Sequence, residues 1–304
     1  MDKKKVTIVT HSSKFHVDDV FAVAALSLLL EKNSSIEVIR TREQAVINTG
    51  DYVVDVGGVY DPSTNRFDHH QFGGAGEGSE GIPYSSFGLV WKHFGNTLCG
   101  DNTEVADVVN KVLVQPIDAH DNGVEIIKES VAGLRPYDLN QLKYIILPTW
   151  KEFDDIDKVF LQTVRYAQWI LSRQIKVASD QVEGRVLVHE KYQSAPDKRI
   201  IEVDERLPWK EVLAQFSEPT YVIYNKRIDN TWSVKTVSVD PHGVGILEFV
   251  PRKAFPFEWA GKRGEDLERV TKVEGSLFSH RNRFLTVVKT REAAFQIAQL
   301  ALNA

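Results

Sequence analysis

Short apolar runs rich in β-branched residues recur in the first part of the chain. They predict buried strands at residues 6–10, 36–41 and 52–56. Longer stretches with helical spacing of apolar residues lie between and after these runs. They predict helices at residues 20–30, 85–94, 103–119 and 154–182. Because strands and helices alternate, we expect an α/β domain with a doubly wound, mostly parallel sheet over residues 1–185.

The pattern changes near residue 184, where short strand-like runs replace the long amphipathic stretches. These runs occupy residues 186–189, 200–203, 221–224, 232–239 and 246–249, and a closing helix is expected at residues 290–302. Asp229 and Asn230 lie between two of the runs and predict a hairpin turn. We therefore expect a linker at residues 184–199 and a smaller α+β domain over residues 195–304.

Composition and charge limit the classes of function. The net charge of −5 over 304 residues provides no broad basic surface, so nucleic acid would have to bind locally in a cleft. Cys99 is the only cysteine, which excludes disulfide frameworks and cysteine metal sites. The sequence shows no apolar run of about 18 residues and no signal or transit peptide. We expect a cytoplasmic protein without a membrane partner.

Histidines and aspartates gather where the predicted strands and helices of the first domain end. They form four segments, which contain His11, His16 and Asp18, then Asp55, then Asp68, His69 and His70, and finally Asp118 and Asp121. In a doubly wound sheet these ends converge on one edge. Imidazole and carboxylate ligands suit a transition-metal ion, and this set is large enough for a pair of ions. Asp55, at the end of the central strand, is the natural shared ligand.

Each segment also has a purely structural explanation. Asp18 could cap the helix that follows it, Asp55 could simply end a strand, and Asp118 could be a solvated helix residue. The adjacent His69 and His70 are harder to explain in this way. On a short strand they would point to opposite faces, so that one binds metal while the other faces a different part of the cleft.

The order of these motifs resembles the melanocyte-proliferating-gene family of the DHH phosphoesterase superfamily. The matching stretches are HSSKFHVDD at residues 11–19, RTR at 40–42, VDVGG at 54–58, FDHHQ at 67–71, SSFGL at 85–89, DAHDNG at 118–123, LPTW at 147–150, PWKE at 208–211 and TREAA at 290–294. They cover almost the whole chain. The resemblance implies a DHH-type first domain and a two-metal phosphoesterase that uses manganese by preference, or magnesium.

The resemblance also assigns roles to residues. One ion would be held by His11, His16 and Asp55, and the other by Asp18, Asp55, His69 and Asp121. His70 would face the substrate phosphate, so that Asp55 and His70 are the expected catalytic residues. We expect Asp121 to be the ligand of the fourth segment, because Asn122 and Gly123 turn the chain there. Asp118 lies within the last turn of the helix and could orient a ligand histidine. In the second domain, His280, Arg281 and Arg283 are candidates for binding phosphate, or else form a solvated basic patch.

Eukaryotic members of the family are associated with 3′-to-5′ RNA exonuclease activity, which implies a short single-stranded RNA as substrate. Two alternatives stay open: hydrolysis of a small phosphate compound such as pyrophosphate or a nucleotide, and a non-catalytic metal-binding module. Aromatic side chains that stack bases would favour RNA, and Trp232 and Trp259 are the candidates in the second domain. A homodimer is also left open.

Overall fold

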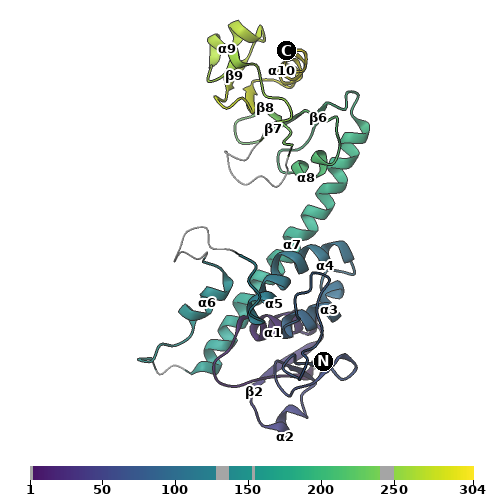
Figure 1. Ribbon diagram of the computed structural model, residues 1–304, viewed down its shortest axis with the longest axis vertical. Helices are drawn as coiled ribbons and strands as arrows, with labels where there is room; N and C mark the ends of the chain where they lie inside the picture. The colour runs from purple at the N-terminus through teal and green to yellow at the C-terminus, as the bar shows by residue number, and fades with distance from the viewer. Residues whose placement is uncertain (1–2, 128–136, 153–154, 240–249) are drawn as a thin grey trace. The chain divides into compact units, whose positions relative to one another are not determined.

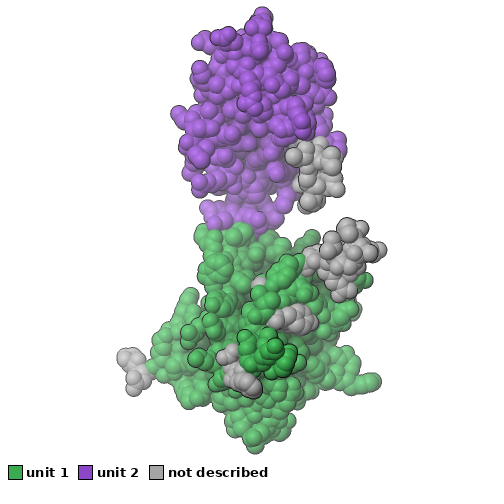
Figure 2. Space-filling view, turned by 90° about the vertical axis from the view of Figure 1, so that its left-hand side faces the viewer, with its two compact units in different colours: residues 1–179 green, residues 180–304 purple. Residues whose placement is uncertain are grey.

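The computed structural model describes residues 3–127, 137–152, 155–239 and 250–304, and these divide into two compact units, residues 1–179 and 180–304 (Figures 1 and 2). The first unit is an α/β unit and the second is a smaller α+β unit. Among the described residues, no helix is both long enough and apolar enough to span a bilayer.

A mostly parallel sheet forms the centre of the first unit. Within the described residues its strand order is β2-β1-β3-β5-β4. The parallel strands are β1 (Lys4–Thr10), β2 (Ser34–Arg40), β3 (Tyr52–Val54) and β5 (Arg66–Phe67), and β4 (Tyr60–Asp61) is antiparallel to β5. The three strands predicted from the apolar runs are present, although β3 ends at Val54 and not at residue 56.

Helices cover both faces of this sheet. On one face Val9 and Val53 pack against Ile47 of the short helix α2 (Gln44–Ile47). Side chains alternate along a strand, so the buried Ile8 and Val54 lie on the other face. The helices in contact with the strands include α1 (Val17–Leu30) and α3 (Ser86–Leu98), which also pack against each other.

Local capping explains where these two helices begin. The carboxylate of Asp19 accepts a hydrogen bond from the His16 backbone N–H, which forms a capping box at the start of α1. The Ser85 hydroxyl oxygen accepts a hydrogen bond from the Gly88 N–H at the start of α3. The helix predicted at residues 103–119 is present as three consecutive segments, α4 (Thr103–Val109), a π-helical turn (Asn110–Val114) and α5 (Gln115–Asp121).

The last helices of the first unit differ from prediction. The sequence pattern did not indicate α6 (Leu139–Ile146). Helix α7 (Ile156–Ser194) runs for 39 residues, so the strand predicted at residues 186–189 and the linker predicted at residues 184–199 are wrong. Val188 and Tyr192 are buried one helical turn apart, against Ile201 and Trp209. An apolar run as short as Val186–Val188 fits a strand or a buried helical turn equally well, and tertiary packing decided between them here.

The second unit contains its own sheet. Over the described residues its strand order is β6-β7-β8-β10-β9. Its strands are β6 (Ile200–Glu202), β7 (Tyr221–Lys226), β8 (Thr231–Thr236), β9 (Ser276–Ser279) and β10 (Leu285–Val288), and its helices are α8 (Trp209–Ala214), α9 (Gly264–Thr271) and α10 (Arg291–Asn303). Asp229 and Asn230 form the predicted hairpin turn, where Asp229 accepts the Thr231 N–H and Asn230 has a φ of 53°. The strand predicted at residues 246–249 lies outside the described residues.

Candidate metal centre

The histidines and aspartates of the first unit meet at the carboxyl edge of its sheet. His11 follows β1, Asp55 follows β3 and His69 follows β5. Because these strands are parallel, their carboxyl ends lie at the same edge. Asp18 joins them from the first turn of α1, and Asp121 joins them from the last residue of α5. The predicted convergence is therefore present in the fold.

In the described part of the chain, three groups of side chains place possible ligand atoms within 4.8 Å of one another. They consist of His11, His16 and Asp55, of Asp55, His69 and His70, and of His16, Asp18 and Asp121. Asp55 belongs to two groups and His16 to two, so the groups form one continuous cluster. A cluster with shared members is the arrangement that a pair of ions requires.

The two carboxylate oxygens of Asp55 face different histidines. Oδ2 lies 3.2 Å from His11 Nε2, and Oδ1 lies 3.3 Å from His69 Nε2. The residue has a φ of 56°, in the left-handed region, which is why β3 ends before it. The buried Ser86 hydroxyl donates a hydrogen bond to Oδ1 at 3.1 Å. Asp55 thus has the geometry of a bridging ligand.

His69 lies at the centre of several carboxylates. Its Nε2 atom is 3.3 Å from Asp55 Oδ1, 3.3 Å from Asp121 Oδ2 and 3.9 Å from Asp18 Oδ2. This nitrogen, both carboxylate oxygens of Asp18 and Asp55 Oδ2 are buried without a hydrogen-bond partner among the described residues. Buried polar atoms of this kind are costly unless something satisfies them. A divalent cation bound to nitrogen and carboxylate oxygen would do so, and the donor set fits such an ion.

The electrostatics of the cluster lead to the same conclusion. Burial, together with the nearby Asp55 and Asp121 carboxylates, raises the pKa of Asp18 well above its usual range. Burial acts in the same direction on Asp55, but contacts with His11 and His69 outweigh it and lower the pKa of Asp55. For His11, burial opposes the charged form, but Asp19 and Asp55 raise its pKa to about 10. Acidic groups this close to one another require positive charge to remain ionised together.

His70 is held by an aspartate that sequence reasoning left without a role. Asp68 Oδ1 lies 2.8 Å from His70 Nδ1 and also accepts the His70 backbone N–H, while Asp68 Oδ2 accepts the Gly58 N–H at 2.6 Å. The hydrogen bond to Asp68 raises the pKa of His70, although burial opposes it. The side chain of His70 is 57 % exposed, so it remains accessible from solvent.

The predicted opposite orientation of the two adjacent histidines is wrong. Both follow β5 instead of lying on it, and the ring centroids of His69 and His70 are only 4.3 Å apart. Both rings reach Asp55 Oδ1, since His70 Nδ1 lies 3.4 Å from it. Strand alternation does not apply beyond the last paired residue.

Asp19 and Arg42 are further members of the site, to which the sequence assigned no role. Asp19 Oδ2 lies 3.1 Å from His11 Nε2, and Asp19 also caps α1. Arg42 Nη2 lies 3.3 Å from His11 Nδ1, and with Lys14 it lines the cavity of about 710 Å³ that contains His11, His16 and Asp55. The cavity is therefore lined by positive side chains as well as by the carboxylate of Asp55.

Arg40 fixes the loop that carries His11 and His16. Its guanidinium donates to the Ser13 carbonyl oxygen at 2.6 Å and to the Asp157 carboxylate of α7 at 2.5 Å. The same group lies over the ring of Phe160, 4.5 Å from its centroid. The first arginine of the RTR motif thus anchors the loop.

Asp118 and Asp121 have different surroundings. Asp121 belongs to the cluster, whereas Asp118 is part of none of the three groups found among the described residues. Asp118 accepts hydrogen bonds from the Ser85 N–H at 3.1 Å and the Ser85 hydroxyl at 2.6 Å. Burial raises the pKa of Asp118 to about 7 in spite of these bonds. Asp118 therefore holds the start of α3, next to the Ser86 that contacts Asp55.

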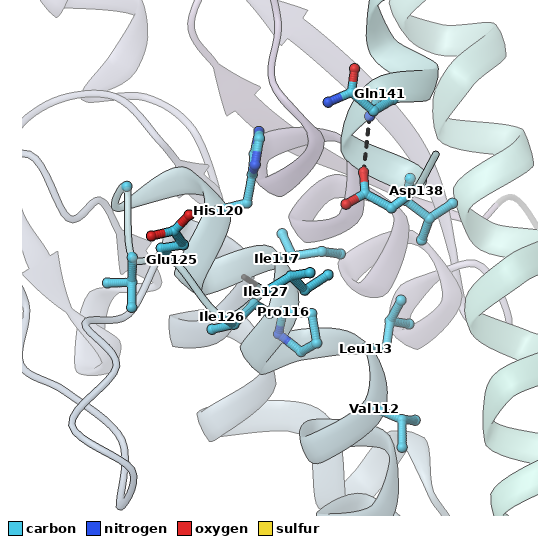
Figure 3. A pocket seen from close by; sticks show the side chains of 13 residues that line it. Val112, Leu113, Pro116, Ile117, His120, Glu125, Ile126, Ile127, Asp138 and Gln141 are labelled. Carbon is cyan, nitrogen blue, oxygen red and sulfur yellow. Dashed lines mark hydrogen bonds between the residues drawn. The ribbon is translucent and has the colours of Figure 1, made fainter. Parts of the chain in front are cut away.

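His120 is adjacent to Asp121 but lines a different cavity. This cavity of about 630 Å³ lies against α5, where Pro116 and Ile117 form apolar walls (Figure 3). At its edge the Gln141 N–H donates to the Asp138 carboxylate. Neighbouring positions on a helix point in different directions, so His120 and Asp121 serve different surfaces.

The candidates in the second unit occupy its turns and core. His280, Arg281 and Arg283 lie on the β9–β10 turn. His280 Nδ1 accepts the Asn282 N–H, and Arg283, with a φ of 59°, donates to the Phe255 carbonyl oxygen. These two residues thus stabilise the turn, while Arg281 is exposed.

The two tryptophans proposed to stack bases contribute to the core of the second unit. Trp259 is only 4 % exposed, and Trp232 packs against the same cluster of buried side chains. Trp259 is therefore not available to a base.

Similarity to known proteins extends over nearly the whole chain. The family model for MYG1 exonucleases, described as an uncharacterised protein family (UPF0160), matches residues 7–302. The MYG1 protein of Schizosaccharomyces pombe is 30 % identical, over 98 % of this chain and 98 % of its own length. The MYG1 exonuclease of Homo sapiens is 32 % identical, over 97 % of this chain and 85 % of its own length. The MYG1 protein of Chlamydia pneumoniae is 29 % identical, over 98 % of this chain and 97 % of its own length.

Proposed function

Because the chain belongs to the MYG1 exonuclease family, we propose that it is a metal-dependent phosphodiesterase of the DHH type that acts as a 3′-to-5′ exoribonuclease on short single-stranded RNA. The observation that carries the proposal is Asp55, whose two carboxylate oxygens face the histidines of two adjoining ligand groups. The word exonuclease in the names of the human and bovine relatives supports the same class of reaction.

The proposed ligands divide between two ions as the resemblance implies. His11, His16 and Asp55 would hold one, and Asp18, Asp55, His69 and Asp121 would hold the other. Two divalent ions, manganese by preference or magnesium, would supply a water of lowered pKa and would neutralise charge on the phosphoryl oxygens. Asp19 and Arg42 flank His11 and fix the orientation of its ring.

His70 acts directly on the substrate in this proposal. Its Nδ1 atom is hydrogen-bonded to Asp68, which leaves Nε2 as the ring atom for the substrate. From there it donates a hydrogen bond to a non-bridging phosphoryl oxygen, or a proton to the leaving oxygen. Lys14 and Arg42 line the same cavity and attract the phosphate.

The overall charge favours a short single-stranded end over a duplex. A protein that binds along a duplex needs many cationic contacts, and a net charge of −5 does not provide a broad surface of that kind. Lys14 and Arg42 provide positive charge inside one cavity, which suits one or two phosphates.

Hydrolysis of a small phosphate compound is the second candidate function. The metal ions, Lys14 and Arg42 would contact only the phosphate group of a substrate, so pyrophosphate would fit them as well as RNA. A non-catalytic module is less well supported, because each ligand position expected from the resemblance carries a suitable side chain in this cluster.

Metal analysis and a release assay test the proposal together. After dialysis against manganese, we expect two ions per chain. Labelled RNA, a dinucleotide and pyrophosphate are then incubated with the manganese-loaded protein, and we expect nucleotides to be released one at a time from the 3′ end of RNA. A stoichiometry of zero or one ion contradicts the two-metal centre. Release from pyrophosphate alone selects the second candidate.

A further inference from the structure

An apolar cavity lies directly beside the metal centre in the first unit. It has a volume of about 260 Å³ and is lined by side chains of α1, α6 and α7 together with the end of the loop before α1. Its walls include Phe15, Val17, Leu139, Ile146, Tyr166 and Trp169. We call it the aromatic cavity. It exceeds the cavity of about 150 Å³ that accommodates benzene in an engineered protein, so there is room for a planar ring.

Two of the polar groups at its walls already have hydrogen-bond partners. The Thr163 hydroxyl donates to the Val159 carbonyl oxygen, one turn earlier on α7. The Tyr166 hydroxyl accepts a hydrogen bond from the Gln162 side chain. The cavity therefore offers faces of carbon and few hydrogen bonds, and its ligand must be an apolar or aromatic group.

The aromatic walls are exposed although they are large. Trp169 is 67 % exposed and Tyr166 is 55 % exposed. They lie three residues apart on α7 and so project from the same side of the helix. Exposed aromatic rings on one side of a helix form a surface suited to stacking a flat ligand.

His16 connects the aromatic cavity to the metal centre. Its side chain lines both the aromatic cavity and the polar cavity that contains Asp55, Arg42 and Lys14. His16 also belongs to two of the ligand groups. A molecule with its phosphate at the metals can therefore place an attached flat group in the aromatic cavity.

We propose that the aromatic cavity binds the base of the nucleotide whose phosphate lies at the metal centre. The inference rests on the proposed function, which supplies the phosphate. Stacking on aromatic faces is tolerant of sequence because every base has a flat face. Since the walls offer few hydrogen bonds, the cavity accepts all four bases. It favours binding of nucleotides over pyrophosphate, which has no base.

Equilibrium binding tests this without relying on turnover. Adenosine 5′-monophosphate and ribose 5-phosphate are titrated into the manganese-loaded full chain by calorimetry. The two share the sugar phosphate and differ at C1′, where the nucleotide carries the base and ribose 5-phosphate carries a hydroxyl group. We expect the wild type to bind the nucleotide more tightly, and Trp169→Ala to weaken nucleotide binding by about 5- to 150-fold, the range for one base-stacking side chain. The affinity for ribose 5-phosphate should stay the same.

Further variants separate loss of stacking from loss of structure. Tyr166→Leu keeps an apolar wall but removes a ring, and should also weaken nucleotide binding selectively. Trp150→Ala removes a tryptophan of the first unit that is 86 % exposed and does not line the aromatic cavity, and should have no effect. Far-UV circular dichroism and manganese content should be unchanged in all three variants.

The outcomes are distinct. If the wild type binds both ligands equally, or if Trp169→Ala weakens both equally, the cavity does not bind a base and the inference is wrong. The same holds if Trp169→Ala changes the mass of the protein in solution without affecting the nucleotide, because the rings then belong to an interface between two copies. If nucleotide selectivity is present but no RNA is hydrolysed, the proposed function fails while this inference stands.

Discussion

Replacing Gly88 by alanine should destabilise the first unit through Asp118. A Cβ atom at Gly88 would lie 2.3 Å from Asp118 Oδ2 and 2.5 Å from Oδ1. Real Cβ atoms do not approach that closely, so the carboxyl group must move away from Ser85. Its two hydrogen bonds to Ser85 would be lost or stretched in a buried environment.

The expected cost follows from three contributions. Forcing an extra methyl group into a packed core costs about 1–3 kcal/mol. Leaving buried hydrogen-bonding groups unsatisfied costs about 1–3 kcal/mol. Alanine in place of glycine inside a helix returns about 0.5–1 kcal/mol. We therefore expect Gly88→Ala to lower the free energy of unfolding by about 3 kcal/mol.

Urea denaturation of the metal-free protein, followed by circular dichroism, measures this quantity. The same substitution is made in an Asp118→Ala background, where the space next to residue 88 is open. There the cost of Gly88→Ala should nearly vanish, which gives a coupling free energy of about 3 kcal/mol between the two positions. If Gly88→Ala costs the same in both backgrounds, the packing of Asp118 against α3 is not the reason for glycine at this position.

Three other predictions concern the metal centre. Asp55→Ala should abolish paired metal binding and activity, whereas His70→Ala should retain both ions and lower the rate of hydrolysis. Metal analysis of both variants tests this, and equal metal loss would contradict these roles. Asp121→Asn should be nearly inactive. Asp118→Asn should have reduced but measurable activity, which added manganese partly restores. The reverse result would exchange the roles of the two residues. Asp68→Asn should lower kcat by about 10- to 100-fold without changing metal content, because the charged acceptor that holds His70 becomes a neutral amide. A loss of metal would show that Asp68 supports the ligands instead.

Strands and ligand segments were predictable where local pattern determines structure. The apolar run at β1 and the parallel pairing it implies place His11 at a sheet edge, and Asp55 and His69 follow by the same rule. Asp68 was not assigned because its role depends on Gly58, ten residues earlier, whose backbone N–H meets its carboxylate only in the folded chain. Asp19 was given no role because its contact with His11, in addition to its cap on α1, is visible only in the folded chain.

The second unit shows a different limit. Residues 285–288 form β10, which the sequence analysis did not predict. Strand β9 pairs with β10 across a short turn, but β8 pairs with it from a distant part of the chain. Helix α7 was predicted to end about twelve residues too early, since only the packing of Val188 and Tyr192 shows that the apolar run is helical. Long-range contacts determine both elements.

The left-handed backbone at Asp55 has a consequence for how this protein can change over time. A residue with a side chain in that conformation costs about 1–2 kcal/mol relative to glycine. Asp55→Gly should therefore relieve backbone strain, but it also removes the contacts with His11 and His69 that lower the pKa of the carboxyl group. Glycine would suit the backbone at this position, whereas a carboxylate is needed for those contacts. A descendant chain that keeps aspartate there, in the same backbone conformation, is under selection for the carboxylate and not for the backbone.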